Sequence, residues 1–262
     1  MLERMSPIDQ NLLDEAVELT RAAGEITLRW FRSLSLAVEH KHDGTPVTEA
    51  DKAAERFLRE EIVRRHPHDS IVGEEEDDVV GISGRTWIID PIDGTKAFTH
   101  GVPLYSNLLA IDDDDGPAVG VINLPGLGET IYAGRGLGCF DNGVRTTVSH
   151  RDRSRGSYLS TSAFNHWPAP MLANVLEAGL QLRTWGDGYG YALVATGRIE
   201  AMVDPEVAHW DVAPMPVIFS EAGGRFSDLH GRPHAGHGSG LATNGVLHDE
   251  LLALLGPIDP VN

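Results

Sequence analysis

The sequence places two carboxylates three residues apart, directly after an apolar run. Asp90 and Asp93 follow the run 87–89, and Gly94 and Thr95 come next. Two carboxylates across such a turn can bracket a hard cation such as Mg²⁺, which prefers oxygen ligands. If Gly94 and Thr95 begin a short helix, their free N–H groups would face a bound phosphate. The alternative is an Asx-type turn that only caps a helix.

Three more acidic residues lie where predicted elements begin or end. Glu74 follows a short predicted strand whose end would point it inward, although a run of three Glu is usually a solvated loop. Asp211 begins a predicted helix, and its simpler interpretation is a carboxylate stabilised by the helix dipole. Asp51 lies in the first turn of another predicted helix, and its simpler interpretation is a capping-box acid paired with Thr48.

The elements that position these residues change character along the chain. In the first half, apolar spacing predicts two long helices and then a run of strands. After about residue 149, short strands and helices alternate, so the first half is typical of α+β proteins and the second of α/β proteins. We expect two lobes, 1–148 with most of the acidic residues and 149–262 completing the site. No linker separates them, so they should pack tightly. The predicted strands of the first half are 70–73, 86–90, 104–111, 117–123, 130–133 and 144–148.

Composition narrows the possible partners. The 262 residues carry a formal net charge of −18, which disfavours nucleic acid and anionic membranes. Bound divalent cations would reverse that potential locally and admit an anionic substrate. The single cysteine, Cys139, cannot form an intrachain disulfide, and no apolar stretch approaches a membrane span. We therefore expect a cytoplasmic protein that acts on a small molecule.

Taken together, these segments resemble the inositol monophosphatase family in order and spacing. The resemblance rests on Glu74 with its preceding glycine, the segment 90–95, Asp211 with Trp210, and the segment 221–224. It implies a layered αβαβα sandwich of the inositol monophosphatase and fructose-1,6-bisphosphatase type. It also implies a Mg²⁺-dependent, lithium-sensitive phosphomonoester hydrolase that forms a homodimer.

The same resemblance implies roles for individual residues. A first Mg²⁺ would use Glu74, Asp90 and the Ile92 carbonyl, and a second would use Asp90, Asp93 and Asp211. A third, weaker ion would use Glu74 and water, and Mn²⁺ can stand in for Mg²⁺. Thr95 and Asp51 would orient the attacking water, with Glu74 completing the catalytic set. We expect direct attack by this water without a phosphoenzyme, since no Cys or Ser in these motifs lies beside a base.

The substrate is expected to contact residues from both halves. The expected contacts are Asp93, Gly94, Thr95, Arg183, Asp187, Asp204 and Asp211. Inositol-type members usually carry a small uncharged residue where this chain has Asp187, and a carboxylate there resembles the histidinol-phosphate phosphatase branch. A carboxylate suits an amine or imidazolium better than a polyol. Alternatively, Asp187 is a helix N-cap. Arg183 could pair with an acidic neighbour or reach the substrate.

Other functions stay open at this point. An inositol-1-phosphate phosphatase, or a phosphatase of broad specificity for sugar and polyol phosphates, would use the same metal ligands. A non-catalytic protein that binds metal or phosphosugars would keep the scaffold, although every expected ligand is present here. The histidines at 230, 234 and 237 lie in a Gly-rich stretch that is typical of a solvated loop rather than a metal site.

Overall fold

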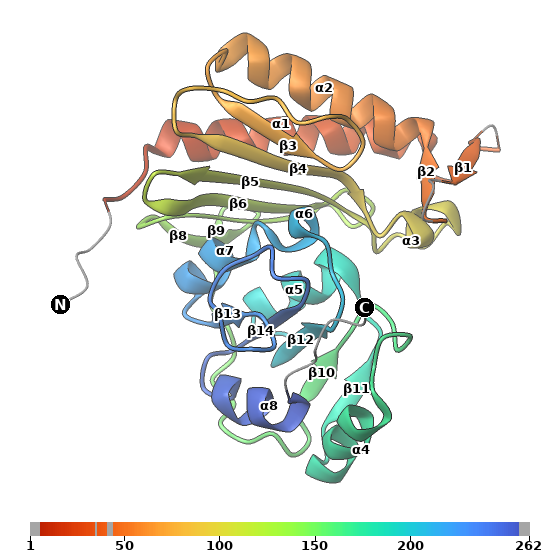
Figure 1. Cartoon of the computed structure of the whole chain (residues 1–262), viewed down its shortest axis with the longest axis vertical. Helices are drawn as coiled ribbons and strands as arrows, with labels where there is room; N and C mark the ends of the chain where they lie inside the picture. The colour runs from red at the N-terminus through yellow and green to blue at the C-terminus, as the bar shows by residue number, and fades with distance from the viewer. Residues whose placement is uncertain (1–5, 35, 41–43, 257–262) are drawn as a thin grey trace.

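The computed structural model describes residues 6–34, 36–40 and 44–256, which form five layers. Figure 1 shows helices α1 (Gln10–Trp30) and α2 (Glu49–Arg65) on the outer face of a seven-stranded sheet. Helices α5 (Asp187–Ala195), α6 (His209–Val212) and α7 (Met215–Ala222) lie between this sheet and a five-stranded one. Helices α4 (Ala169–Ala178) and α8 (His248–Leu255) form the last layer. The expected αβαβα sandwich is confirmed.

The seven-stranded sheet follows the order β3-β4-β5-β6-β7-β8-β9, with β3 and β4 parallel and the remaining pairs antiparallel. Because helices cover both faces, its central strands are apolar on both sides, as in the continuous run 87–89. Its strands are β3 (Ser70–Gly73), β4 (Thr86–Asp93), β5 (Ser106–Asp113), β6 (Gly116–Leu124), β7 (Glu129–Gly134), β8 (Gly138–Asp141) and β9 (Val144–Arg145).

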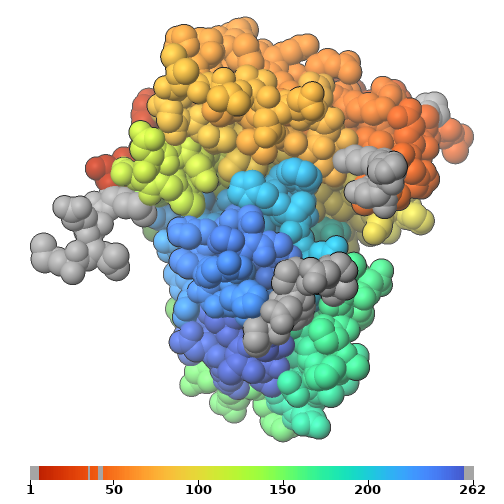
Figure 2. All heavy atoms as spheres, in the orientation of Figure 1, coloured from red at the N-terminus to blue at the C-terminus, as the bar shows by residue number. Residues whose placement is uncertain are grey.

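The five-stranded sheet follows the order β11-β10-β12-β14-β13. Strands β10, β11 and β12 pair in parallel, and β14 pairs antiparallel with both β12 and β13. In Figure 2 the late part of the chain, green to blue, lies below the early part and meets it along a broad front. The strands are β10 (Tyr158–Ser160), β11 (Gln181–Arg183), β12 (Ala201–Asp204), β13 (Arg225–Ser227) and β14 (Gly240–Thr243).

Local signals explain where the long helices begin. Asp9 accepts a hydrogen bond from the backbone N–H of Asn11 and caps α1. Thr48 caps α2 and forms a full capping box with Asp51, so the capping interpretation of Asp51 is confirmed. Thr48 also ends β2 (Pro46–Thr48), which pairs with β1 (Val38–His40) to form a small hairpin beside α3 (Thr95–Thr99).

Several sequence expectations about strands need correction. Strand β4 continues to Asp93 rather than stopping at Asp90, because it pairs with β5 through a register shift between these two residues. Strand β8, which holds the buried Cys139, was not predicted at all. Strand β9 is only two residues long. The Gly-rich histidine stretch 230–238 is an exposed loop, as expected, and none of the described helices is both long and apolar enough to cross a membrane.

Candidate active site and metal centre

A cleft of about 430 Å³ opens where the end of β4 meets the first turns of α5 and α6. The β1–β2 hairpin contributes Thr45 and Pro46 to its rim, and the loop after β10 contributes Ser162 and Ala163. The cleft therefore collects residues from distant parts of the sequence. The predicted site residues that line it are Glu74, Asp90, Ile92, Asp93, Gly94, Thr95, Asp187 and Asp211.

Three carboxylates in this cleft lie close together. One oxygen of each of Asp90, Asp93 and Asp211 lies within 4.8 Å of the other two. The register shift between Asp90 and Asp93 lets one strand turn both side chains toward the same place. Asp211 is held at the start of α6, where its Oδ2 accepts a 3.0 Å hydrogen bond from the N–H of Ala208. Asp211 therefore combines both expected features, the helix-start carboxylate and the cleft residue.

The electrostatics of this cluster call for a cation. Burial and the neighbouring carboxylates raise the pKa values of Asp90 and Asp93 well above their usual range, and burial raises the pKa of Asp211 to about 7. Among the described residues that line the cleft, Lys96 is the only Lys or Arg. The possible donors in this cluster are all carboxylate oxygens, and their negative charges repel one another when no cation is bound. Such a set of donors fits a hard divalent ion such as Mg²⁺.

Glu74 and Ile92 extend the oxygen donor set. Glu74 follows the last residue of β3, and its charge and hydrogen bonding also raise the pKa of Asp90. The N–H of Ile92 donates a 3.0 Å hydrogen bond to Asp90 Oδ1. The Ile92 carbonyl accepts a 3.0 Å hydrogen bond from Thr95 Oγ1, at the edge of the cleft. Both residues thus line the same cleft as the three carboxylates.

Asp51 lies behind the cleft rather than in its lining. Its Oδ2 accepts hydrogen bonds from the backbone N–H and the hydroxyl of Thr48, at 2.8 and 2.5 Å. Its Oδ1 lies 3.5 Å from the hydroxyl of Thr95, which does line the cleft. Burial raises the pKa of Asp51 to about 6. The structure therefore joins the predicted Asp51 and Thr95 pair through one long hydrogen bond.

Asp187 enters the cleft from the opposite wall. It is the first residue of α5, with a backbone φ of 54°, and its N–H donates a 2.8 Å hydrogen bond to Ser162 Oγ. A Cβ on Gly94 would approach Asp187 Oδ2 to 2.9 Å, so the Asp187 side chain would have to shift if position 94 were not glycine. The N-cap of α5 is Gly186 and has no side-chain hydrogen bond. The interpretation of Asp187 as the N-cap is therefore wrong.

Two predicted substrate contacts do not line the cleft. Asp204 is buried and accepts hydrogen bonds from the Ser162 N–H and the Tyr191 hydroxyl, at 2.9 and 3.0 Å. It thus supports the loop that faces Asp187. Arg183 stacks its guanidinium over the rings of Tyr158 and Trp185, at 5.1 and 5.6 Å from their centroids.

Some residues of the site carried no recognisable sequence signal. Ser106 donates a 2.6 Å hydrogen bond to Asp93 Oδ2, and the Gly188 N–H donates to the same oxygen at 2.5 Å. Ser162 contacts Asp187 across a gap of 25 residues in the sequence. Lys96 was not predicted as a site residue, although the sequence could have indicated it, because it directly follows the segment expected to face the phosphate.

A layered sandwich with an acidic oxygen cluster in the cleft between its sheets defines a metal-dependent phosphoric monoester hydrolase. The family model of the inositol monophosphatase family matches residues 9–258. The chain belongs to the inositol monophosphatase family, whose members depend on Mg²⁺.

Individual relatives agree with this assignment. The chain is 43% identical to the histidinol-phosphatase of Chlorobaculum parvum, over 93% of this chain and 96% of the relative. It is 39% identical to the histidinol-phosphatase of Mycobacterium tuberculosis, over 92% and 96% of the two chains. Among solved structures, the Thermotoga maritima IMPase superposes with a TM-score of 0.82 at 31% identity, covering 94% of this chain and 97% of the other.

Proposed function

We propose that this phosphatase hydrolyses histidinol phosphate, and that the carboxylate of Asp187 selects the substrate's amine or imidazolium group. The observation that carries the proposal is the position of Asp187, which lines the cleft against Gly94 and next to Gly188, whose N–H donates a hydrogen bond to Asp93. A half-buried carboxylate there favours a cationic leaving group over a neutral polyol, because a polyol would leave the charge without a partner. Relatives at 39–43% identity that are named histidinol-phosphatase support the same substrate.

In this proposal the acidic cluster holds the metal. Glu74, Asp90 and the Ile92 carbonyl would bind one Mg²⁺, while Asp90 would share a second with Asp93 and Asp211. A third, weaker ion would use Glu74 and water. Bound Mg²⁺ supplies a lowered pKa for the attacking water and neutralises the phosphate and the leaving oxygen. Mn²⁺ would bind the same oxygen donors.

The neighbouring residues position the reacting water and the phosphate. The single proton of the Thr95 hydroxyl can be donated to the Ile92 carbonyl or to Asp51 Oδ1. When it is donated to Asp51, Thr95 Oγ1 can accept a proton from the water, and Asp51 is the acceptor behind it. The N–H groups of Gly94 and Thr95 are offered to the phosphate at the start of α3. We assign Asp204 and Arg183 indirect roles, because neither lines the cleft. The family resemblance supports a homodimer, and the acidic composition without a membrane-length apolar stretch supports a cytoplasmic location.

A broader phosphatase is the second candidate. The chain is 30% identical to the fructose-1,6-bisphosphatase/inositol-1-monophosphatase of Thermotoga maritima, over 94% of this chain. The same metal ligands would serve such a substrate, so the choice between the two candidates depends on whether Asp187 selects a cationic group on the substrate.

The test compares phosphate release from L-histidinol phosphate, inositol 1-phosphate and fructose 1,6-bisphosphate, with Mg²⁺ and with chelator. We expect a preference of about 100-fold or more in kcat/KM for histidinol phosphate, which corresponds to about 2.7 kcal/mol. Asp187→Asn should reduce that preference by at least about tenfold. Asp249→Asn is the matched control, because Asp249 is also a first-turn acid, in α8, but does not line the cleft. Comparable wild-type rates on the three substrates would favour the broader phosphatase.

A further inference from the structure

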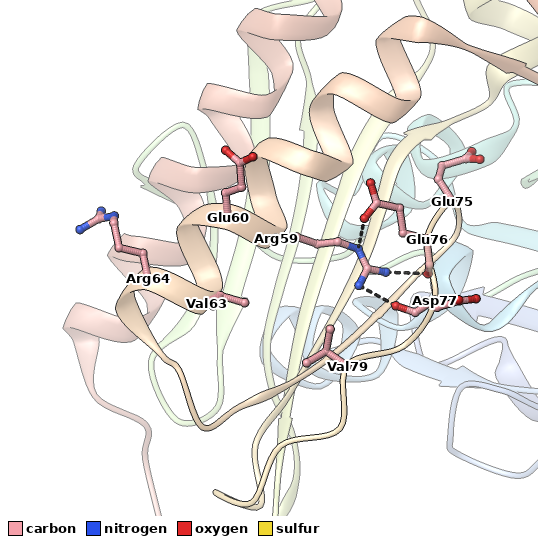
Figure 3. Close-up of a pocket in the computed structure, with 8 residues that line it drawn as sticks. All are labelled: Arg59, Glu60, Val63, Arg64, Glu75, Glu76, Asp77 and Val79. Carbon is pink, nitrogen blue, oxygen red and sulfur yellow. Dashed lines mark hydrogen bonds and ion pairs between the residues drawn. The ribbon is translucent and has the colours of Figure 1, made fainter.

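One face of α2 carries three charged residues at successive helical turns. Asp51, Glu55 and Arg59 are spaced four residues apart and are all buried. Asp51 reaches Thr95 at the cleft. Glu55 and Arg59 instead contact the loop that follows Glu74, after the end of β3. Figure 3 shows Arg59 extending from α2 to this loop, with its guanidinium between the helix and the segment that holds Glu76 and Asp77.

The pair Glu55–Arg59 holds this loop through its backbone. The Glu55 carboxylate accepts the N–H groups of Glu75 and Glu76, at 2.9 and 3.0 Å. It also accepts the Arg59 Nε–H at 2.8 Å. The Arg59 guanidinium donates to the carbonyls of Glu76 and Asp77, at 2.7 and 2.9 Å. Hydrogen bonds in both directions therefore fix the main chain directly after Glu74.

Gly73 gives independent support for a built contact. A Cβ at this position would overlap the Glu55 carboxylate and the Arg59 guanidinium. The residue that precedes Glu74 is thus also packed against the pair. Main chain on both sides of Glu74 is therefore set by the same two side chains of α2.

The negative charge of the loop explains why its main chain has to be held by Glu55 and Arg59. Residues 74–78 are five consecutive acids, which repel one another and favour an open loop. Arg59, whose side chain is 8% exposed, is the cation against them and lies 3.9 Å from a Glu76 oxygen. Its planar fork can serve two carbonyls and Glu55 at once, whereas a lysine carries all its donors on one nitrogen and lacks this fixed geometry.

We propose that Glu55 and Arg59 are positioning residues that hold Glu74 ready for the metal. This inference rests on the proposed role of Glu74 as a ligand. Outer contacts that orient a ligand typically change metal affinity or activity by about 10- to 100-fold. A pair that only stabilised the fold would change thermal stability without changing metal affinity.

The experiment measures Mg²⁺ binding by calorimetry and amide hydrogen exchange over 74–78, on the full chain without substrate. Arg59→Lys keeps the charge, so Glu55 is not left without a cation, while two carbonyl contacts are lost. We expect Mg²⁺ affinity to fall about tenfold or more, and exchange in the loop to accelerate. Lost turnover should recover at high Mg²⁺, with KM for the phosphate ester unchanged. Glu55→Gln is the second variant and should show the same pattern.

Arg65→Lys is the matched control, because Arg65 ends the same helix but pairs with Glu15, Glu18 and Glu61. It should bind Mg²⁺ as the wild type does. Glu74→Gln tests the ligand role of Glu74 separately from the positioning role of Glu55 and Arg59. If it binds Mg²⁺ normally, the metal assignment fails and the positioning role with it. If it binds weakly while folded Arg59→Lys and Glu55→Gln bind normally, only the positioning role is overturned.

Discussion

Single residues of the site differ in how far the sequence could place them. Asp90, Asp93 and Asp211 were predictable, because their motifs stand in an order and spacing that the family shares. Their mutual contact was implied by the resemblance alone, since 118 residues separate Asp93 from Asp211 in the numbering. The contact between Ser162 and Asp187 was not predictable, because nothing local marks a serine after a strand as a partner for a distant helix start.

Asp93→Asn separates the metal role from the fold. The amide oxygen can still accept from Ser106 and Gly188, so the variant should fold. In chelator it should melt at or above the wild-type temperature, because the neutral amide replaces a carboxyl group whose charged form is disfavoured by burial and by its acidic neighbours. Phosphate release in Mg²⁺ should fall by several orders of magnitude. Near-native turnover would show that Asp93 is not a metal ligand.

The elements were easier to predict than their exact ends. Periodicity identified α1, α2 and most strands, because each buries a regular set of apolar side chains. The extension of β4 was missed, because its last residues depend on pairing with β5, which local sequence does not encode. Strand β8 was missed because its four residues begin with a glycine and show no alternation of apolar and polar side chains.

The N-cap of α2 offers a prediction at this scale. Thr48→Ala removes the hydroxyl that accepts from the Ala50 N–H and donates to Asp51. We expect a loss of about 1 kcal/mol in the free energy of unfolding. We also expect a lower kcat, because Asp51 loses one of the groups that orient it.

Asp9→Ala is its control, since Asp9 caps α1 away from the cleft. Denaturant unfolding should show a similar loss of stability, while kcat stays at the wild-type value. Equal changes of kcat in both variants would contradict a specific role for the α2 cap.

The whole molecule balances a large negative charge against a need to bind an anion. Its formal net charge is −18, and the acidic cluster lines the cleft at the end of β4, where Asp90 and Asp93 are buried. The fold class could be predicted from the motifs, whereas the approach of the two cleft walls could not, because it depends on how the layers pack. Mg²⁺ binding should therefore raise the free energy of unfolding as well as support catalysis.

Stability in chelator should fall as pH rises from 6.5 to 8.5. Asp211 has its pKa raised to about 7, and burial and neighbouring carboxylates raise the pKa values of Asp90 and Asp93 well above the unfolded value of 3.8, so the folded chain retains protons that the unfolded chain has lost. Raising the pH removes this advantage, at about 1.4 kcal/mol per pH unit for each titrating group. His248, whose pKa is lowered to about 4, opposes the trend only at the low end of this window, because the unfolded imidazole still loses its proton near pH 6.5 while the folded one is already neutral.

Thermal melts from pH 6.5 to 8.5 test this expectation. Each kcal/mol lost corresponds to roughly 2–4 °C in Tm for a chain of this size. Saturating Mg²⁺ should raise Tm and flatten the profile, and Asp211→Asn should reduce both effects. A Tm in chelator that increases with pH would contradict the assigned pKa directions.

The left-handed backbone of Asp187 also bears on how this protein can evolve. A non-glycine residue at φ 54° has a conformational cost of about 1–3 kcal/mol, and glycine would avoid it. A laboratory population selected only for heat resistance should therefore drift toward glycine at position 187, while one selected for growth on the amine-bearing ester should keep the carboxylate. The fraction of the population with glycine or aspartate at position 187 would therefore indicate which of the two selections had been applied.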